Sequence, residues 1–336
     1  MTTAPSTLAR SRPRRPRVQR SHLPVLATLA LLVIMYTAGV VRYDGFADPQ
    51  VLLNVFIDNG FLLVVSVGMT FVILTGGIDL SVGAVVALTT IVAASLLRDG
   101  WPAGVVLVLV LLIGSTLGLA MGCIIHYFEI QPFVVTLAGM FLARGLCYTI
   151  STSAITIDNG FWTSMANSRI RFGDNHISPS VVIALVALLI AGYVLAATPF
   201  GRNVHAIGGN AQSALLMGLP VARTRIAVYT VSGFCSALGG VLITFYEASG
   251  DPLRAIGMEL DAIAAVVIGG TLLTGGSGYL IGTVLGVLVL GLIQTVITVE
   301  GTLSSWWTRI VIGVLLLAFI LLQRLVVLRR HPQPPP

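Results

Sequence analysis

One short stretch, LTGGIDLSVG at residues 74–83, interrupts two long apolar runs with glycines, an aspartate and a serine. The run before it, 51–73, carries one charged residue, Asp58, and the run after it, 82–97, carries none. Each run approaches the roughly 20 residues that a helix needs to cross a bilayer core. Backbone that leaves the helix at that depth has no water to bond, so it is stable only beside protein or a polar cavity. The sequence therefore predicts two interrupted helices inside a membrane.

Similar apolar runs recur along the chain, which is 56% hydrophobic and only 10% charged over 336 residues. That composition excludes a soluble globular fold and predicts an all-α, polytopic membrane protein. Runs bounded by proline, glycine and charged residues indicate about ten transmembrane helices in one domain at 23–326. They lie at 23–41, 51–75, 78–97, 103–125, 133–150, 179–197, 226–246, 260–274, 278–298 and 307–326. The eighth run is short, which favours a helix that stops partway across.

The arginines predict the orientation of the chain. Of nineteen arginines, six lie in 1–22, three in 198–225 and three from residue 324 onward. By the positive-inside rule these segments face the cytoplasm, and both termini with them. The arginine- and proline-rich segment 1–22 is predicted to be a disordered tail, and 327–336 a second cytoplasmic tail. A cleaved signal peptide is the alternative at the amino end, but the run at 23–41 is long for one and lacks a cleavage site.

The residue inventory excludes several kinds of chemistry. There is no lysine, which removes P-loop and Schiff-base chemistry, so any ATP must be hydrolysed by another chain. The histidines lack metal-ligand spacing, and Cys123, Cys147 and Cys235 lie in apolar runs, where small buried side chains are expected. No Ser–His–Asp or Cys–His arrangement is evident. The sequence thus predicts no catalytic residue, no metal site, no cofactor of its own and no nucleic-acid partner.

Polar side chains inside the predicted spans are the candidates for a substrate pathway. They are Asn54, Asp58, Asn59, Asp79, Ser81, Gln294 and Thr295. Asp79 and Ser81 begin the third span, where they either cap the helix or lie beside a transport route. The other five lie toward the outer ends of the second and ninth spans. Amides and hydroxyls of this kind either bind sugar hydroxyls or hold helices together by hydrogen bonds.

The interruption at 74–83 has a second copy. LTGGSGYLIG at 273–282 keeps the Leu, the Thr, both adjacent glycines and the final glycine in register. Paired interrupted segments in two halves of a transporter point to its pathway, although glycine-rich helices also share such letters by chance. Three glycines spaced by four, Gly114, Gly118 and Gly122, predict close helix packing.

Two connections are long enough to carry structure. The outer one, 151–178, is expected to hold a short helix and a binding surface. The cytoplasmic one, 198–225, is either a docking surface or a solvated connector; in it Asn210 is predicted to cap a short helix at 211–217 that Gly218 ends. Trp162 is expected at the membrane interface, and Arg144, inside the fifth span, is expected to reach the interface or a carboxylate.

Four segments carry a resemblance to a known family. They are VGMTFVILTGGIDLSVG at 67–83, VTLAGMFLARG at 135–145, FGRNVHAIGGNAQSALLMGL at 200–219 and ELDAIAAVVIGGTLLTGGSG at 259–278. The chain resembles, over 40–326, the permease subunits of bacterial ATP-binding-cassette (ABC) monosaccharide importers of the ribose type. Its segments 57–70 and 301–310 are most similar to the members that import galactofuranose.

The resemblance implies the ABC importer permease fold with interrupted helices and a place in the bacterial inner membrane. The implied protein partners are a cytoplasmic ABC ATPase that binds the ATP, a second permease, identical or different, and a periplasmic sugar-binding protein. The other implied partners are a monosaccharide and membrane lipid. Coupling to the ATPase is implied for the segment 201–219, through Gly201, Arg202, Asn210, Ala214 and Gly218.

Two other functions use the same residues differently. An ion-coupled secondary sugar transporter needs carboxylates inside the membrane as ion sites, and Asp79 is the strong candidate near the inner half. A polytopic membrane enzyme needs a polar catalytic cluster, and none can be assembled from the sequence.

Overall fold

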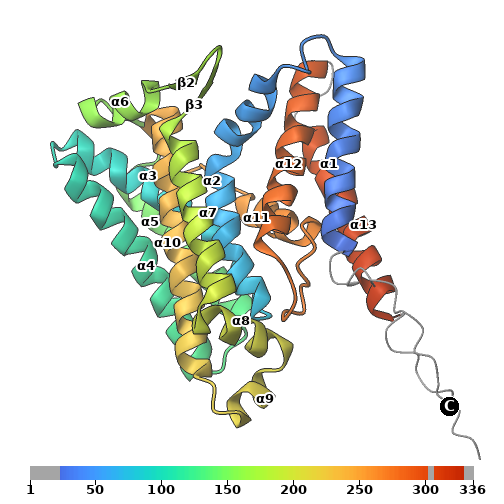
Figure 1. The fold of residues 1–336 in the computed structure, drawn as a ribbon. Coiled ribbons are helices and arrows are strands. Elements are labelled where there is room, and N and C mark those ends of the chain that lie inside the picture. Colours follow the sequence, from blue (N-terminus) through green and yellow to red (C-terminus); the bar gives the residue numbers. More distant parts are fainter. Residues whose placement is uncertain (1–22, 302–305, 329–336) are drawn as a thin grey trace, which may run out of the picture.

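The structure, a computed structural model, describes residues 23–301 and 306–328. The predicted tail at 1–22 lies outside these residues, as does 329–336 of the second predicted tail. The described chain is mostly helical (Figure 1). In chain order its elements are α1 (Leu23–Arg42), α2 (Pro49–Leu74), α3 (Val82–Arg98), α4 (Ala103–Tyr127), α5 (Pro132–Ile150), β1 (Ile155–Thr156), α6 (Gly160–Asn167), β2 (Ile170–Phe172), β3 (Asn175–Ile177), α7 (Pro179–Ala197), α8 (Pro199–Gly209), α9 (Ala211–Leu216), α10 (Val221–Glu247), β4 (Ser249–Gly250), α11 (Met258–Ile268), α12 (Leu280–Glu300) and α13 (Trp306–Leu328).

Helix α2 lies at the centre of the bundle. It packs against α10, α12, α7 and α11, with α3, α4 and α5 on one side of it and α1, α12 and α13 on the other (Figure 1). Elements α6, β2 and β3 lie at one end of the bundle, called here the α6 end, and α8 and α9 lie at the opposite, α9 end (Figure 1).

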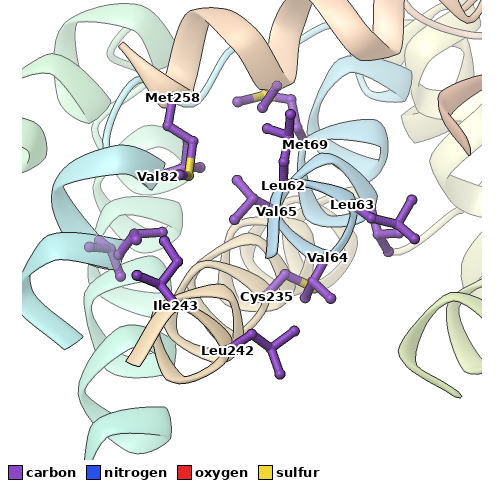
Figure 2. Close-up of a cluster of buried hydrophobic side chains, with 14 of the residues drawn as sticks. Leu62, Leu63, Val64, Val65, Met69, Val82, Cys235, Leu242, Ile243 and Met258 are labelled. Atoms are coloured by element: carbon purple, nitrogen blue, oxygen red, sulfur yellow. The ribbon is translucent and has the colours of Figure 1, made fainter. Parts of the chain in front are cut away.

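The hydrophobic core forms around the second half of α2. Every residue from Asn59 to Leu74 except Phe61 is buried, which requires protein rather than lipid on all sides of this half-helix. Figure 2 shows Leu62, Val65 and Met69 of α2 near side chains of α3, α10 and α11. The second half of the apolar run at 51–73, which predicted a membrane span, is therefore the interior of the bundle.

The glycines spaced by four bring α4 and α10 into close contact, as predicted. A β-carbon built on Gly118 would lie 2.2 Å from the carbonyl oxygen of Tyr229, and one on Gly114 would lie 2.6 Å from that of Gly233. Such backbone approach is possible only where a side chain is absent on the contacting face.

The predicted count of about ten transmembrane helices is not confirmed. Each predicted run contains a helix, but seven of the helices in the described residues are long and apolar enough to cross a membrane: α1, α2, α4, α5, α7, α10 and α12. Helix α3 begins only at Val82, because residues 75–81 form a turn and an irregular segment, and α11 ends at Ile268, before Gly270 at φ 94°. The two interruptions thus shorten the spans predicted at 78–97 and 260–274.

The connection at 151–178 carries the expected short helix, α6, and folds onto the bundle. Strand β1 pairs antiparallel with β4, Ile155 opposite Gly250. The expectation that Trp162 is an interfacial anchor is wrong: its side chain is fully buried, and its Nε1 donates to Thr244 Oγ1 of α10 at 2.9 Å. Burial of this ring against α10 fixes α6 to the bundle.

Arg144 also differs from the expectation of a carboxylate partner, because among the described residues it bonds backbone carbonyl oxygens. Its Nη1 donates to the carbonyl oxygens of Pro252, at 2.6 Å, and Arg254, at 2.9 Å. These residues belong to the non-helical segment that leads into α11, whose carbonyls have no partner within a helix. The guanidinium replaces the missing backbone hydrogen bonds there.

Candidate functional site

A polar cavity lies between α2 and α12 toward the α6 end. This α2–α12 cavity has a volume of about 420 Å³. Five of the seven predicted pathway residues line it, namely Asn54, Asp58, Asn59, Gln294 and Thr295, together with Asp44 and Thr298. The structure therefore brings together side chains that the sequence places in two distant spans.

Neighbouring groups hold several of these side chains in place. Tyr246 Oη donates to Asp58 Oδ1 at 3.0 Å, and Asn59 Nδ2 donates to the Val55 carbonyl oxygen at 3.0 Å. Gly291 allows α12 to approach, since a β-carbon there would lie 2.6 Å from Asn59 Nδ2. Among the described residues, Asp44 and Asp58 line this cavity and no arginine does. Its lining therefore suits a neutral polyhydroxylated solute and disfavours an anion.

Asp79 and Ser81 lie apart from this cavity and are buried. Asp79 Oδ1 accepts from the Ser81 backbone N–H at 2.9 Å and from Ser81 Oγ at 2.6 Å, and Asp79 Oδ2 accepts from Ser232 Oγ at 2.7 Å. The carboxylate thus bonds the amide of Ser81, the residue before α3, and among the described residues it accepts from no amide within that helix, so the contact is a local turn and not a helix cap. Ser81 itself makes no side-chain cap bond. The partner on α10, Ser232, was not predicted, because nothing local marks it.

The two LTGG copies meet each other. The Gly276 backbone N–H donates to the Leu74 carbonyl oxygen at 2.9 Å. The equivalent glycines of the copies, Gly76 and Gly275, are so close that a β-carbon on Gly275 would lie 2.7 Å from the Gly76 nitrogen. Both have positive φ, 79° and 84°, which favours glycine. The shared letters therefore mark two breaks that form one contact.

Helix α8 lies directly on this contact. A β-carbon on Gly208 would lie 1.7 Å from the Leu74 carbonyl oxygen and 2.4 Å from the Gly276 nitrogen. We call this arrangement of Leu74, Gly276 and Gly208 the LTGG junction. Backbone atoms thus join α8 to the ends of both interrupted segments, with no flexible side chain between.

Helix α8 was missed by the sequence analysis, which predicted within 198–225 only the short helix at 211–217. The local signal is nevertheless present: Thr198 Oγ1 accepts from the Gly201 N–H, and Pro199 occupies the first helical turn.

Helix α9 forms as predicted. Asn210 Oδ1 accepts from the Ser213 N–H at 2.8 Å, and the helix ends before Gly218, which has φ 77°. Ala214 is buried against Ile207 of α8, which joins the two helices into one unit. Gly201 packs against the Leu195 carbonyl oxygen, and Arg202 is exposed.

The other face of α9 is apolar and exposed. Leu215, Leu216 and Met217 are 63%, 83% and 68% exposed. Three adjacent apolar side chains at the tip of a helix form a surface that a partner protein can cover. The geometry thus favours the docking alternative for this connection over a solvated connector.

Comparisons with known proteins show the family of the chain. The family described as "Branched-chain amino acid transport system / permease component" matches residues 51–320. The inner membrane ABC transporter permease protein YjfF of Escherichia coli is 43% identical over 94% of this chain and 97% of its own length. The fructose import permease protein FruG of Bifidobacterium longum is 40% identical over 97% of this chain and 98% of its own length. The ribose import permease protein RbsC of Haemophilus influenzae is 36% identical over 87% of this chain and 90% of its own length. No solved structure matches the chain. The chain therefore belongs to the family of branched-chain amino acid transport system permease components, and along most of its length it is similar to an ABC transporter permease protein and to sugar import permease proteins.

Proposed function

We propose that this protein is a permease subunit of an ABC importer that carries a neutral monosaccharide across the bacterial inner membrane. The observation that supports this most directly is the α2–α12 cavity, which gathers amides, hydroxyls and two carboxylates without an arginine. In this proposal the α6 end faces the periplasm and receives sugar from a binding protein. The sugars named for the relatives are fructose and ribose, and the resemblance of segments 57–70 and 301–310 favours galactofuranose or a similar sugar.

The α9 end, with both termini, faces the cytoplasm in this proposal. The ATPase of a separate chain covers the apolar face of α9, and α8 transmits its movement to the LTGG junction. A second permease, identical or different, completes the passage. The chain itself hydrolyses nothing, in keeping with its lack of lysine. The ion-coupled alternative finds no observation in its favour, because Asp79 is occupied by three hydrogen bonds.

The test is uptake by proteoliposomes that contain this permease with its ATPase, its partner permease and its binding protein. Uptake of radiolabelled galactofuranose, ribose and fructose is compared with and without ATP. We expect ATP-dependent uptake of a furanose sugar. Vesicles holding this chain alone that accumulate sugar on an ion gradient would overturn the proposal.

A matched pair of variants tests the cavity. Thr295 lines the cavity, and its hydroxyl donates to the Gly291 carbonyl oxygen. Thr116 lies on the exposed face of α4, and its hydroxyl donates to the Ile113 carbonyl oxygen. Because loss of one hydrogen bond costs about 1 kcal/mol, Thr295→Val combined with Gln294→Leu is expected to raise the half-saturating sugar concentration by roughly tenfold or more. Thr116→Val is expected to leave it unchanged. Equal behaviour of the two variants contradicts a sugar site in this cavity.

A further inference from the structure

A second polar cavity lies at the α9 end, separate from the α2–α12 cavity. Its volume is about 550 Å³. It is lined by the C-terminal end of α4, the N-terminal ends of α5 and α10, helix α9 and residues 75–77 of the first interruption. The proposed route for the sugar does not use it as a binding site. Its polar lining includes His126, Gln131, Gln212, Arg225 and Tyr229.

Two buried polar atoms, on residues that line this cavity, have no hydrogen-bond partner among the described residues. They are Tyr229 Oη and His126 Nδ1. The Tyr229 side chain is only 1% exposed. A buried hydroxyl without a partner is costly, and native proteins rarely keep one unless something polar occupies the adjoining space. Two such atoms on different helices, both on residues that line one cavity, indicate a polar occupant, to which the Tyr229 hydroxyl can donate while His126 Nδ1 donates or accepts according to its tautomer.

The charged group of the cavity points to the kind of occupant. Arg225 is half-buried and makes no ion pair within the part of the chain that the structure describes. It lies one helical turn before Tyr229 on the same face of α10. The carboxylate in the lining, Glu129, belongs to an exposed residue at the rim. A guanidinium beside a phenol, an imidazole and two amides matches a phosphate group that carries hydroxyls.

We propose that this cavity binds a hydroxylated phosphate ester, with Arg225 on the phosphate and Tyr229 Oη donating to an ester or hydroxyl oxygen. Two sources share this chemistry at a cytoplasmic membrane surface: a phosphorylated monosaccharide, the product of a kinase acting on the imported sugar, and the headgroup of phosphatidylglycerol. Placing the cavity on the cytoplasmic side rests on the proposed function. Tyr229 Oη also adjoins Gly77 of the interruption, where a β-carbon would lie 2.3 Å from it, so an occupant would contact the moving part of the permease.

The full chain in nanodiscs provides the test. Isothermal titration calorimetry in phosphatidylcholine discs follows binding of ribose 5-phosphate, of inorganic phosphate and of ribose as the uncharged control. Mass spectrometry of the purified protein detects retained phosphatidylglycerol. Neither measurement depends on transport, so failure of sugar uptake and failure of this site are separate results.

Three variants report on the site. Arg225→Gln removes the charge, Tyr229→Phe removes only the unpartnered hydroxyl, and Arg223→Gln is the control, since Arg223 is exposed nearby and does not line the cavity. We expect Arg225→Gln to weaken binding about tenfold or more and Tyr229→Phe about three- to tenfold, with Arg223→Gln within about twofold.

The outcomes separate the sources. Saturable ribose 5-phosphate binding in phosphatidylcholine discs supports a soluble ester, and phosphatidylglycerol that is retained by the unaltered protein but lost from Arg225→Gln supports a headgroup. Equal binding by Arg225→Gln and Arg223→Gln overturns the proposal. So does the absence of both saturable binding and retained lipid, which leaves ordered water as the occupant.

Discussion

The LTGG junction makes a sharp prediction about a single methyl group. In the proposed mechanism, movement of the ATPase reaches the interrupted helices through α8, and Gly208 is the point of contact. Substitution Gly208→Ala adds a β-carbon where the Leu74 carbonyl oxygen is 1.7 Å away and the Gly276 nitrogen 2.4 Å away. Non-bonded heavy atoms need about 3.5 Å, so α8 has to withdraw by roughly 1.5 to 2 Å.

The cost follows from the contacts that are disturbed. Overpacking of this kind costs about 1 to 3 kcal/mol, and weakening the hydrogen bond from Gly276 to Leu74 costs about 1 kcal/mol more. The better helix propensity of alanine returns up to about 1 kcal/mol. A net cost of about 1 to 3 kcal/mol against the docked position of α8 corresponds to a roughly 5- to 150-fold change in its population.

The assay compares sugar uptake with ATP hydrolysis in proteoliposomes that contain the complete importer. We expect Gly208→Ala to lower uptake at least fivefold while ATP hydrolysis persists, because the exposed face of α9 is untouched. Gly209→Ala is the matched control: it adds the same methyl group one residue along the same helix, where nothing lies within 4 Å. Size-exclusion chromatography of both variants checks that they assemble. If Gly208→Ala transports as well as Gly209→Ala, α8 does not act through this junction.

Two further predictions concern stability, measured as the thermal unfolding midpoint of the purified protein in detergent. Ser232→Ala leaves Asp79 Oδ2 without its donor and is expected to cost about 1 to 3 kcal/mol of stability. The control is Ser236→Ala, which is expected to cost less because the Ser236 hydroxyl bonds only the Ser232 carbonyl oxygen. Equal midpoints for the two variants refute the role given to Ser232. Gly118→Ala places a β-carbon 2.2 Å from the Tyr229 carbonyl oxygen and is expected to cost about 1 to 3 kcal/mol of stability. The control is Gly104→Ala on the same helix, where the added β-carbon meets open space. An unchanged midpoint for Gly118→Ala shows that α4 and α10 separate freely.

Features that depend on neighbours in the chain were predictable from the sequence. Helix α9 is one example, since the Asn210 cap and the left-handed Gly218 act within a few residues of the helix they bound. The close packing along Gly118 is another, because spacing by four places glycines on one helix face. Helix α8 was missed although its Thr198 cap and its proline are local signals of a helix start.

Features that depend on distant partners were not predictable. The repeated letters at 74–83 and 273–282 suggested a repeat, but not that Gly76 and Gly275 lie against each other. In the same way, Arg144 could not be assigned to the carbonyl oxygens of Pro252 and Arg254, and Trp162 looked like an interfacial residue until Thr244 was found beside it. An apolar run has the same composition whether lipid or protein surrounds it, so burial of α2 could not be read from residues 51–73.

By itself the sequence determined that this chain lies in a membrane as helices with two glycine-rich interruptions, since hydrophobic length, capping and glycine conformation act locally. The tertiary structure alone decided which interruption meets which, that Gly208 of α8 joins them, and which polar side chains share a cavity. These are matters of packing between helices that are far apart in the chain, and the free energy of such contacts depends on shape and on hydrogen-bond partners that no single segment contains.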